Sequence, residues 1–307
     1  MEKRTTLREL VAQGQIMAPC VFDNISVRTT ELCNYKAAVL DGNELAYAMC
    51  GFPNSTMLNA EEIIWLAHRM TDCTSLPLIV DIRNGYGSSE LNCYVNAYRL
   101  AKNNVMAIIV DDSLGTDDLE SCTLQAKIVP TEIFYARVKA VKQACENTDC
   151  IVIARTEGIE TIGLNDAISR CIGARKHGAD ITGIVGLKNV EQAKEFQRQE
   201  PGVKMWFSLG ALDGCFDVEP AAIDSLNFKL VSFHYAVKGA FWGMLYYGKR
   251  TLEDGNTVFH DTHDFDGLLM PGQDYHELFS FWKKWLPIED DFNDVSDVMA
   301  KTYDIRL

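Results

Sequence analysis

The strongest constraint on the fold is a series of short apolar segments separated by longer amphipathic ones. Eight of these segments have the length and near-continuous apolar character of buried strands: 17–22, 37–41, 77–81, 106–112, 150–155, 179–185, 203–208 and 229–234. Strands of this kind are typical of a parallel sheet that is covered by helices on both faces.

The intervening segments have helical periodicity. Residues 59–72 carry apolar side chains at Ile63, Ile64, Leu66 and Ala67, and the helix predicted from residue 164 onward ends at Gly178. Glycine is common at helix C-termini. Strands that alternate with helices in this number predict a (β/α)8 TIM barrel. A doubly wound sheet is the alternative, but the sequence lacks the Gly-x-Gly-x-x-Gly turn that usually follows its first strand.

Two regions are predicted along the chain. Residues 1–250 form the barrel, and residues 251–307 form a loop and helical extension that packs on the barrel or on a neighbouring subunit. In this extension an aromatic stripe recurs at helical spacing, with Leu278, Phe281, Trp282 and Trp285. Such a stripe requires a surface that covers it.

Composition narrows the choice of partners and compartment. The 307 residues carry a formal net charge of -14, which disfavours binding to nucleic acid and to anionic membranes. The first residues lack the apolar run of a secretory signal, and no apolar stretch is long enough to predict a transmembrane helix. The 10 cysteines include no Cys-x-x-Cys pair and fit a reducing compartment. We therefore expect a cytoplasmic protein.

Ionisable residues gather where the predicted strands end. In a TIM barrel these ends and the loops after them form the active-site face. The positions are held by Asp23, Asp41, Asp81, Arg83, Asp111, Asp112, Arg155, Glu157, Ser208 and His234. Salt bridges that merely close the rim are the alternative for any single residue, whereas the set together indicates a ligand site.

The residue types at this rim indicate the ligand. Carboxylates suit Mg²⁺, and Arg155 suits an anionic substrate because guanidinium binds carboxylate or phosphate bidentately. A small acid held by metal and arginine is therefore predicted. His234 is either a general acid or base or a hydrogen-bonded core histidine. The histidines of "FHDTHDFD" at 259–266 are assigned to a hydrophilic loop rather than to a zinc site.

Several segments together resemble the phosphoenolpyruvate mutase/isocitrate lyase superfamily over roughly residues 7–248. They are "APCVFDNISVRTTEL", "GFPNSTMLNAEEIIWLAHRM", "LPLIVDIRNGYG", "IVIARTEGI", "ARKHGADI" and "GLKNVEQAKEF". The resemblance implies a TIM barrel, a homodimer or homotetramer that often exchanges its last helix, and a site for Mg²⁺ with a 2-oxo acid or its enolate.

The resemblance also implies roles for individual residues. Asp81 corresponds to the direct metal ligand, and Asp111 stands where the family has a longer carboxylate. Arg155 corresponds to the arginine that holds the substrate carboxylate. Gly42 corresponds to the glycine whose backbone cradles the anionic end of the substrate, and its neighbours Asp41 and Asn43 are assigned to the same substrate-binding loop.

Other candidate residues complete the set. Gly85, Tyr86 and Gly87 match the turn after the metal ligand and are predicted to bind substrate, as are Glu157, Ser208 and His234. Cys122 corresponds, with a shift of one residue, to the lid cysteine that acts as acid or base in the C–C lyases. We therefore predict three catalytic residues, which are Cys122, Arg155 and Arg83. Of these, Cys122 is the predicted proton donor.

The sequence departs from the family pattern at charged positions. Arg83 replaces a second loop aspartate, Asn54 replaces another acid, and Val185 replaces a glutamate. The lid "LESCTLQ" matches neither the lyases nor the mutases. Because two unit charges about 4 Å apart interact by about 4 kcal/mol at an effective dielectric constant near 20, Arg83 weakens the prediction of Mg²⁺.

Two interpretations of Arg83 follow. Either it points outward or pairs with Asp81 or Asp111, which leaves a weak metal site, or its guanidinium takes the place of the metal and holds the substrate directly. The predicted activity is C–C bond cleavage in a small 2-hydroxy or 2-oxo di- or tricarboxylate through an enolate. The alternatives are P–C bond chemistry on a phosphonate substrate and a barrel that binds a metabolite or partner without catalysis.

Overall fold

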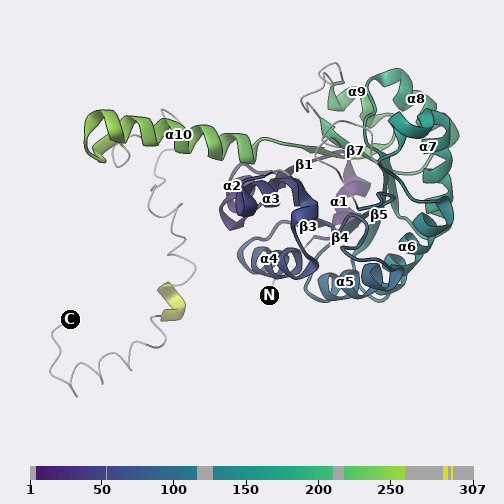
Figure 1. Cartoon of the computed structure of the whole chain (residues 1–307), viewed down its shortest axis with the longest axis horizontal. Helices are drawn as coiled ribbons and strands as arrows, with labels where there is room; N and C mark the ends of the chain where they lie inside the picture. Colours follow the sequence, from purple (N-terminus) through teal and green to yellow (C-terminus); the bar gives the residue numbers. More distant parts are fainter. Residues whose placement is uncertain are drawn as a thin grey trace. The chain divides into compact units, whose positions relative to one another are not determined.

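The barrel predicted from the strand pattern is confirmed by a computed structural model, which describes residues 5–52, 54–115, 127–209, 218–259, 286–289 and 292. Parallel strands close in chain order from β1 to β8 (Figure 1). Their bounds are β1 Ile16–Val21, β2 Ala38–Leu40, β3 Leu78–Asp81, β4 Ala107–Asp111, β5 Ile151–Thr156, β6 Ile181–Ile184, β7 Lys204–Leu209 and β8 Phe228–Phe233. Closure between β8 and β1 excludes the open doubly wound sheet.

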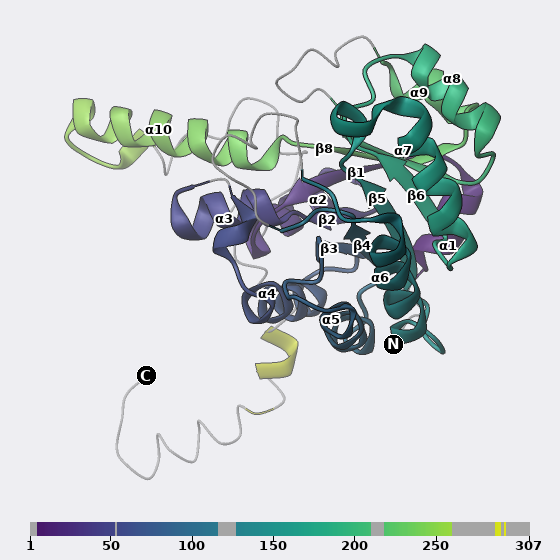
Figure 2. The same cartoon turned by 45° about the vertical axis from the view of Figure 1, so that its right-hand side comes forward.

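The helices are α1 Leu7–Gln13, α2 Asn24–Leu32, α3 Gly42–Cys50, α4 Ala60–Cys73, α5 Glu90–Lys102, α6 Thr131–Ala144, α7 Ile159–Lys176, α8 Val190–Gln199, α9 Pro220–Asp224 and α10 Ala236–Asp254, with a short 3-10 helix η1 at Ser55–Met57. Those from α2 to α9 surround the strands (Figure 1). Figure 2 shows α4, α5 and α6 side by side along the outside of the barrel. The covering helices explain why the strands are apolar on both faces.

The helix signals in the sequence act locally as expected. In α4 the predicted side chains Ile63, Ile64, Leu66 and Ala67 are all buried. Helix α7 starts earlier than predicted, at Ile159, because a first short helical segment precedes a break at Gly163 and continues into the predicted helix.

The core has one layer inside the barrel and others between strands and helices. Inward-facing residues such as Ile79, Ile109 and Ile153 fill the interior, and Leu7 of α1 joins this cluster. Since α1 precedes the first strand, it covers the end of the barrel opposite the strand C-termini.

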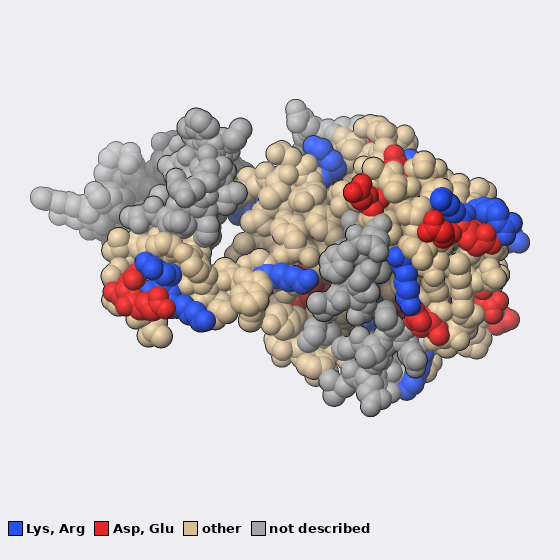
Figure 3. Space-filling model, turned by 90° about the horizontal axis from the view of Figure 1, so that it is seen from above, with Lys and Arg blue, Asp and Glu red and all other residues tan. Residues whose placement is uncertain are grey.

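The chain divides into two compact units, Met1–Phe241 and Trp242–Leu307, and α10 contains residues of both. The aromatic stripe and the histidine loop predicted in the second unit lie outside the described residues, so their roles stay predictions. None of the helices that the structure describes is sufficiently long and apolar to cross a membrane. On the face drawn in Figure 3, Lys and Arg of the barrel lie beside Asp and Glu.

Candidate active site

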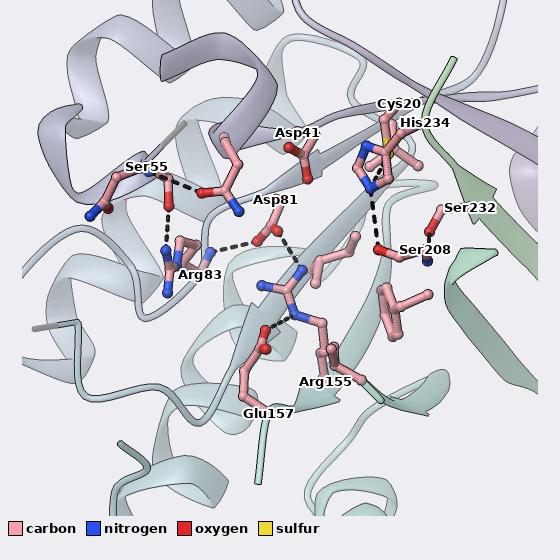
Figure 4. A pocket seen from close by; sticks show the side chains of 17 residues that line it. Cys20, Asp41, Ser55, Asp81, Arg83, Arg155, Glu157, Ser208, Ser232 and His234 are labelled. Atoms are coloured by element: carbon pink, nitrogen blue, oxygen red, sulfur yellow. Dashed lines mark hydrogen bonds and ion pairs between the residues drawn. The ribbon is translucent and has the colours of Figure 1, made fainter. Parts of the chain in front are cut away.

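A cavity of about 190 Å³ opens at the C-terminal ends of the strands. We call it the rim cavity, and Figure 4 shows its side chains. It is lined by Cys20, Val39, Asp41, Gly42, Asn43, Asn54, Ser55, Asp81, Arg83, Ile109, Arg155, Glu157, Val185, Phe207, Ser208, Ser232 and His234. Its volume is below the roughly 300–1,000 Å³ typical of sites for drug-sized ligands, so it suits a small molecule.

Strand register brings the principal charged residues together. Asp111, the last residue of β4, pairs with Arg155 of β5, and Asp81 ends the adjacent strand β3. The Arg155 guanidinium donates through Nη1 to Asp81 and, at 2.6 Å, through Nη2 to Asp111 Oδ2. Its Nε lies 2.7 Å from Glu157 Oε1. Arg155 therefore contacts three buried or nearly buried carboxylates at once.

Arg83 adds a second guanidinium to this group. Its Nε lies 3.9 Å from Asp111 Oδ2, and its Nη1 donates to Ser55 Oγ. Its backbone N–H donates to Asp81 Oδ1 at 2.8 Å, with a φ of 50° in the left-handed region. Arg83 thus both pairs with Asp111 and lines the rim cavity. We call Asp81, Arg83, Asp111, Arg155 and Glu157 the arginine cluster.

Burial and the guanidinium groups act oppositely on these carboxyl groups. Burial raises the pKa of Asp81 above its usual value despite the charge of Arg155. Burial also acts to raise the pKa of Asp111, but Arg155 and Arg83 hold that pKa below its usual value. Burial raises the pKa of Glu157 to about 7, again against Arg155. When Glu157 is protonated, the two guanidinium groups balance Asp81 and Asp111.

As arranged, Asp81 and Asp111 do not fit Mg²⁺. Asp81 accepts from the backbone of Arg83 through Oδ1 and from Arg155 through Oδ2. Asp111 accepts from Ser113 N–H and O–H through Oδ1 and from Arg155 through Oδ2. Every oxygen of the two predicted metal ligands already faces a protein donor. Two guanidinium groups also lie beside the position where a hard cation would need those oxygens.

The predicted anion-binding loop reaches the cavity at the start of α3. Asp41 caps this helix by accepting from Glu44 N–H at 2.9 Å, and Gly42 and Asn43 open its first turn. N–H groups of a first helical turn have no acceptor within the helix. A Cβ at Gly42 would lie 2.9 Å from both Ser55 Cβ and Tyr86 Oη, so only glycine fits. The hydroxyl of Tyr86 therefore limits the space beside Gly42.

A histidine occupies another side of the rim cavity. His234 follows β8, and its Nδ1 lies 2.8 Å from Glu44 Oε1. Its Nε2 lies 3.2 Å from Ser208 Oγ and 3.9 Å from Cys20 Sγ. We call Ser208, His234 and Glu44 the histidine chain. Figure 4 shows His234 and Ser208 on the opposite side of the view from Arg83 and Ser55.

Other predicted residues lie away from the cavity lining. Gly85, in the left-handed region at a φ of 93°, packs against Cys93, and Gly87 packs against Asn92. Asp23 caps α2 through Ser26 N–H. Asp112 is fully buried, where it accepts from Thr156 Oγ1 at 2.6 Å and from Arg170 at 3.0 Å. Cys122 lies outside the described residues, so its role stays a prediction.

Sequence reasoning missed three members of the site. Ser55 is the partner of Arg83, Glu44 is the partner of His234, and Cys20 faces His234 from β1. Glu44 was missed because it lies in the first turn of α3, where an acidic side chain stabilises the helix by interacting with its dipole and needs no further explanation. Its burial, at 5% exposure, is the signal that sets it apart.

Comparison with known proteins identifies the family to which this barrel belongs. A family model described as phosphoenolpyruvate phosphomutase matches residues 7–244. The chain belongs to the phosphoenolpyruvate mutase/isocitrate lyase superfamily. Superfamily members include C–C lyases and phosphoenolpyruvate mutases, so the resemblance drawn from the sequence motifs is confirmed.

Curated relatives in the superfamily have different activities. An oxaloacetate decarboxylase of Paraburkholderia xenovorans is 28% identical over 191 residues, which cover 62% of this chain and 63% of that protein. A 2-methylisocitrate lyase of Shewanella oneidensis is 28% identical over 169 residues, covering 55% and 57%. The matched region thus spans less than two thirds of these relatives.

Solved structures support the fold over more of the chain. A 2,3-dimethylmalate lyase has a TM-score of 0.78 at 21% identity, covering 93% of this chain and 97% of that one. A phosphonopyruvate hydrolase, solved with oxalate and Mg²⁺, has a TM-score of 0.76 at 22% identity, covering 92% and 97%. These structures show the shared barrel.

Proposed function

We propose that the chain is a lyase that cleaves a C–C bond in a small 2-oxo or 2-hydroxy di- or tricarboxylate through an enolate. The observation that carries the proposal is the rim cavity itself. It combines a small volume with the guanidinium of Arg83 and the first turn of α3. Both features suit the anionic oxygens of a short acid.

Arg83 is the residue we assign to the substrate. Arg83 and Arg155 both line the cavity, but Arg155 contacts three carboxylates, whereas Arg83 contacts Asp111 at 3.9 Å and the hydroxyl of Ser55. A guanidinium placed where negative charge develops stabilises an enolate oxygen without reorganisation. In this proposal Arg155 holds the carboxylates in place, and Arg83 contacts the reacting group.

The proposed reaction does not depend on Mg²⁺. A structurally similar phosphonopyruvate hydrolase was solved with Mg²⁺, yet the carboxylate oxygens of Asp81 and Asp111 in this chain face Arg155, Arg83 and Ser113. We therefore assign the stabilisation of the negative charge on the enolate oxygen to Arg83 and not to a metal ion. Turnover that survives EDTA supports this assignment. Activity that disappears with EDTA and returns with Mg²⁺ shows instead that the carboxylates rearrange to bind the ion.

The test is a substrate screen followed by NMR. Purified protein is incubated with oxaloacetate, 2-methylisocitrate, isocitrate, 2,3-dimethylmalate and phosphonopyruvate, with proton and phosphorus spectra recorded over time. We expect pyruvate, glyoxylate or succinate above the rate without protein. The Arg83→Ala variant should lose this activity, whereas Arg198→Ala, which removes a surface guanidinium paired with Glu195, should keep it.

Two outcomes would favour the alternatives. Loss of the P–C signal of phosphonopyruvate would favour phosphonate chemistry, for which Glu157 beside Arg155 is the supporting feature. Thermal stabilisation by oxalate with no turnover of any substrate would favour a barrel that binds a small acid without catalysis.

A further inference from the structure

The histidine chain is a second functional feature of the rim cavity. Its three members come from distant parts of the chain, with Glu44 on α3, Ser208 on β7 and His234 after β8. Two hydrogen bonds link them, of 2.8 Å at His234 Nδ1 and 3.2 Å at His234 Nε2. Ser208 and His234 both line the cavity.

The direction of the hydrogen bonds follows from Glu44. Burial raises the pKa of Glu44 above its usual value, and the hydrogen bond with His234 opposes that rise. The ionised carboxylate only accepts hydrogen bonds, so with it His234 Nδ1 carries a hydrogen and the imidazole is held in one orientation. Glu44 is buried, and its Oε2 has no hydrogen-bond partner among the described residues. Its interaction is therefore directed toward His234.

The position of Ser208 is also unusual. Its φ is 56°, in a region that residues other than glycine seldom adopt. Its N–H donates to Ser232 Oγ at 3.1 Å, which fixes the backbone while Oγ faces His234. Unusual backbone conformations of this kind are enriched at functional sites.

We propose that Ser208, His234 and Glu44 form a proton relay that protonates the enolate carbon after C–C cleavage. This inference rests on the proposed lyase function and deepens it. Ser208 is the catalytic residue that touches the product, and His234 acts through it. The relay supplies the proton from residues of β7, of α3 and of the segment after β8.

Protonation of the enolate carbon proceeds through the hydroxyl of Ser208. When the C–C bond breaks, its electron pair stays on the carbon next to the carbonyl group of the enolate. That carbon takes the proton of Ser208 Oγ–H, while the His234 imidazolium transfers its Nε2 proton to the same oxygen. Neutral His234 then regains a proton from water, and no oxidant or reductant is needed.

The surroundings support an imidazolium at rest. Burial acts to lower the pKa of His234, but the hydrogen bond that its Nδ1–H donates to Glu44 and the charges of Asp41 and Glu44 raise that pKa above its usual value. Lys238 of α10 opposes them, and Cys20 faces the ring from β1. Burial keeps the pKa of the Cys20 thiol well above its usual range, so its thiol stays neutral.

The test uses pyruvate in D2O, because exchange of its methyl hydrogens reverses the protonation step without needing C–C cleavage. We expect exchange in the wild type and a loss of about 100-fold in both Ser208→Ala and His234→Gln. Removal of a proton from pyruvate requires neutral His234, so the exchange rate rises with pH through its pKa. Glu44→Gln should move this rise to lower pH, which a merely structural role would not do.

Controls separate the possible failures. Ser169→Ala and His177→Gln replace surface residues that hydrogen-bond within α7 and should exchange like the wild type. Exchange without cleavage of any acid leaves the relay standing and refutes the proposed lyase function. Absent exchange in the wild type, or full exchange in Ser208→Ala, refutes the relay.

Discussion

The arginine cluster and the histidine chain hold charge in different ways. The cluster sets two permanently charged guanidinium groups against three carboxylates, with Asp111 fully buried. The guanidinium charges do not change with pH, although Glu157 in the same cluster has a pKa of about 7. In the histidine chain the imidazole of His234 is the group that titrates near neutral pH. Permanent guanidinium charges suit the binding of an anion, and an imidazole on the cavity wall suits proton transfer. We therefore assign binding to the arginines and acid–base chemistry to His234.

The largest effect is expected at the centre of the cluster. Arg155→Met leaves Asp81, Asp111 and Glu157 without their shared cation. Because an uncompensated buried charge is strongly destabilising, we expect the free energy of unfolding to fall by about 3–5 kcal/mol in urea denaturation. Arg198→Met removes an exposed guanidinium and is the matched control. Equal effects of the two substitutions would show that the cluster is not held by Arg155.

The next largest effect concerns Glu157 and pH. Its pKa of about 7 in the folded protein exceeds the ordinary value, so its ionisation costs stability as the pH rises through that value. Glu157→Gln removes this cost. The stability of the variant relative to wild type should increase by about 1–3 kcal/mol between pH 5 and pH 8.

The control for this measurement is Glu195→Gln. Hydrogen bonds from Arg198 and Gln199 lower the pKa of Glu195 to about 2, so it stays ionised across the same range. Its substitution should therefore give a difference that does not change with pH. A flat difference for Glu157→Gln as well would contradict the raised pKa.

A smaller effect is expected where Arg83 meets the cavity wall. Ser55→Ala removes the hydroxyl that accepts from Arg83 Nη1. A single net hydrogen bond is worth roughly 1 kcal/mol, so oxalate affinity should fall about threefold to tenfold in calorimetric titration. Ser169→Ala on the surface of α7 should bind oxalate normally. Unchanged affinity in Ser55→Ala would remove Ser55 from the positioning of Arg83.

The smallest stability effect is expected in the histidine chain. Because the pKa of His234 is raised on folding, its stabilisation is present at acidic pH and is lost as the pH rises through the folded value. His234→Gln should thus lose about 1 kcal/mol at pH 6 and less at pH 9. A loss that grows with pH would mean that His234 is buried neutral. The surface substitution His177→Gln controls for a general effect of losing a histidine.

The fold was predictable because its signal is local. Each buried parallel strand is a short apolar run, and the strand that ends in Asp81 or Asp111 can be recognised without knowledge of its neighbours. The start of α7 was missed because Gly163 interrupts the helical periodicity that marks the rest of that helix. Hydrophobic pattern thus determined the barrel, and irregular backbone limited the accuracy of boundaries.

The site was predictable only in part, because partners are set by register and loop path. Strand ends located Asp81, Arg155 and His234 at one rim. That Arg155 would contact three carboxylates follows from the pairing of β4 with β5, which the sequence does not display. Ser55 lies in a loop helix, and its contact with Arg83 depends on tertiary packing.

The three contacts of Arg155 also bear on how such a site evolves. Loss of Arg155, or of the carboxylate at Asp81 or Asp111, leaves an uncompensated charge in the interior, and residues that share a partner do not contribute independently. Substitutions at Asp81 or Asp111 are therefore tolerated mainly alongside a compensating change at Arg83 or Arg155. Divergence at this rim must proceed through correlated replacements, and redesign toward another member of the superfamily should alter opposite charges together.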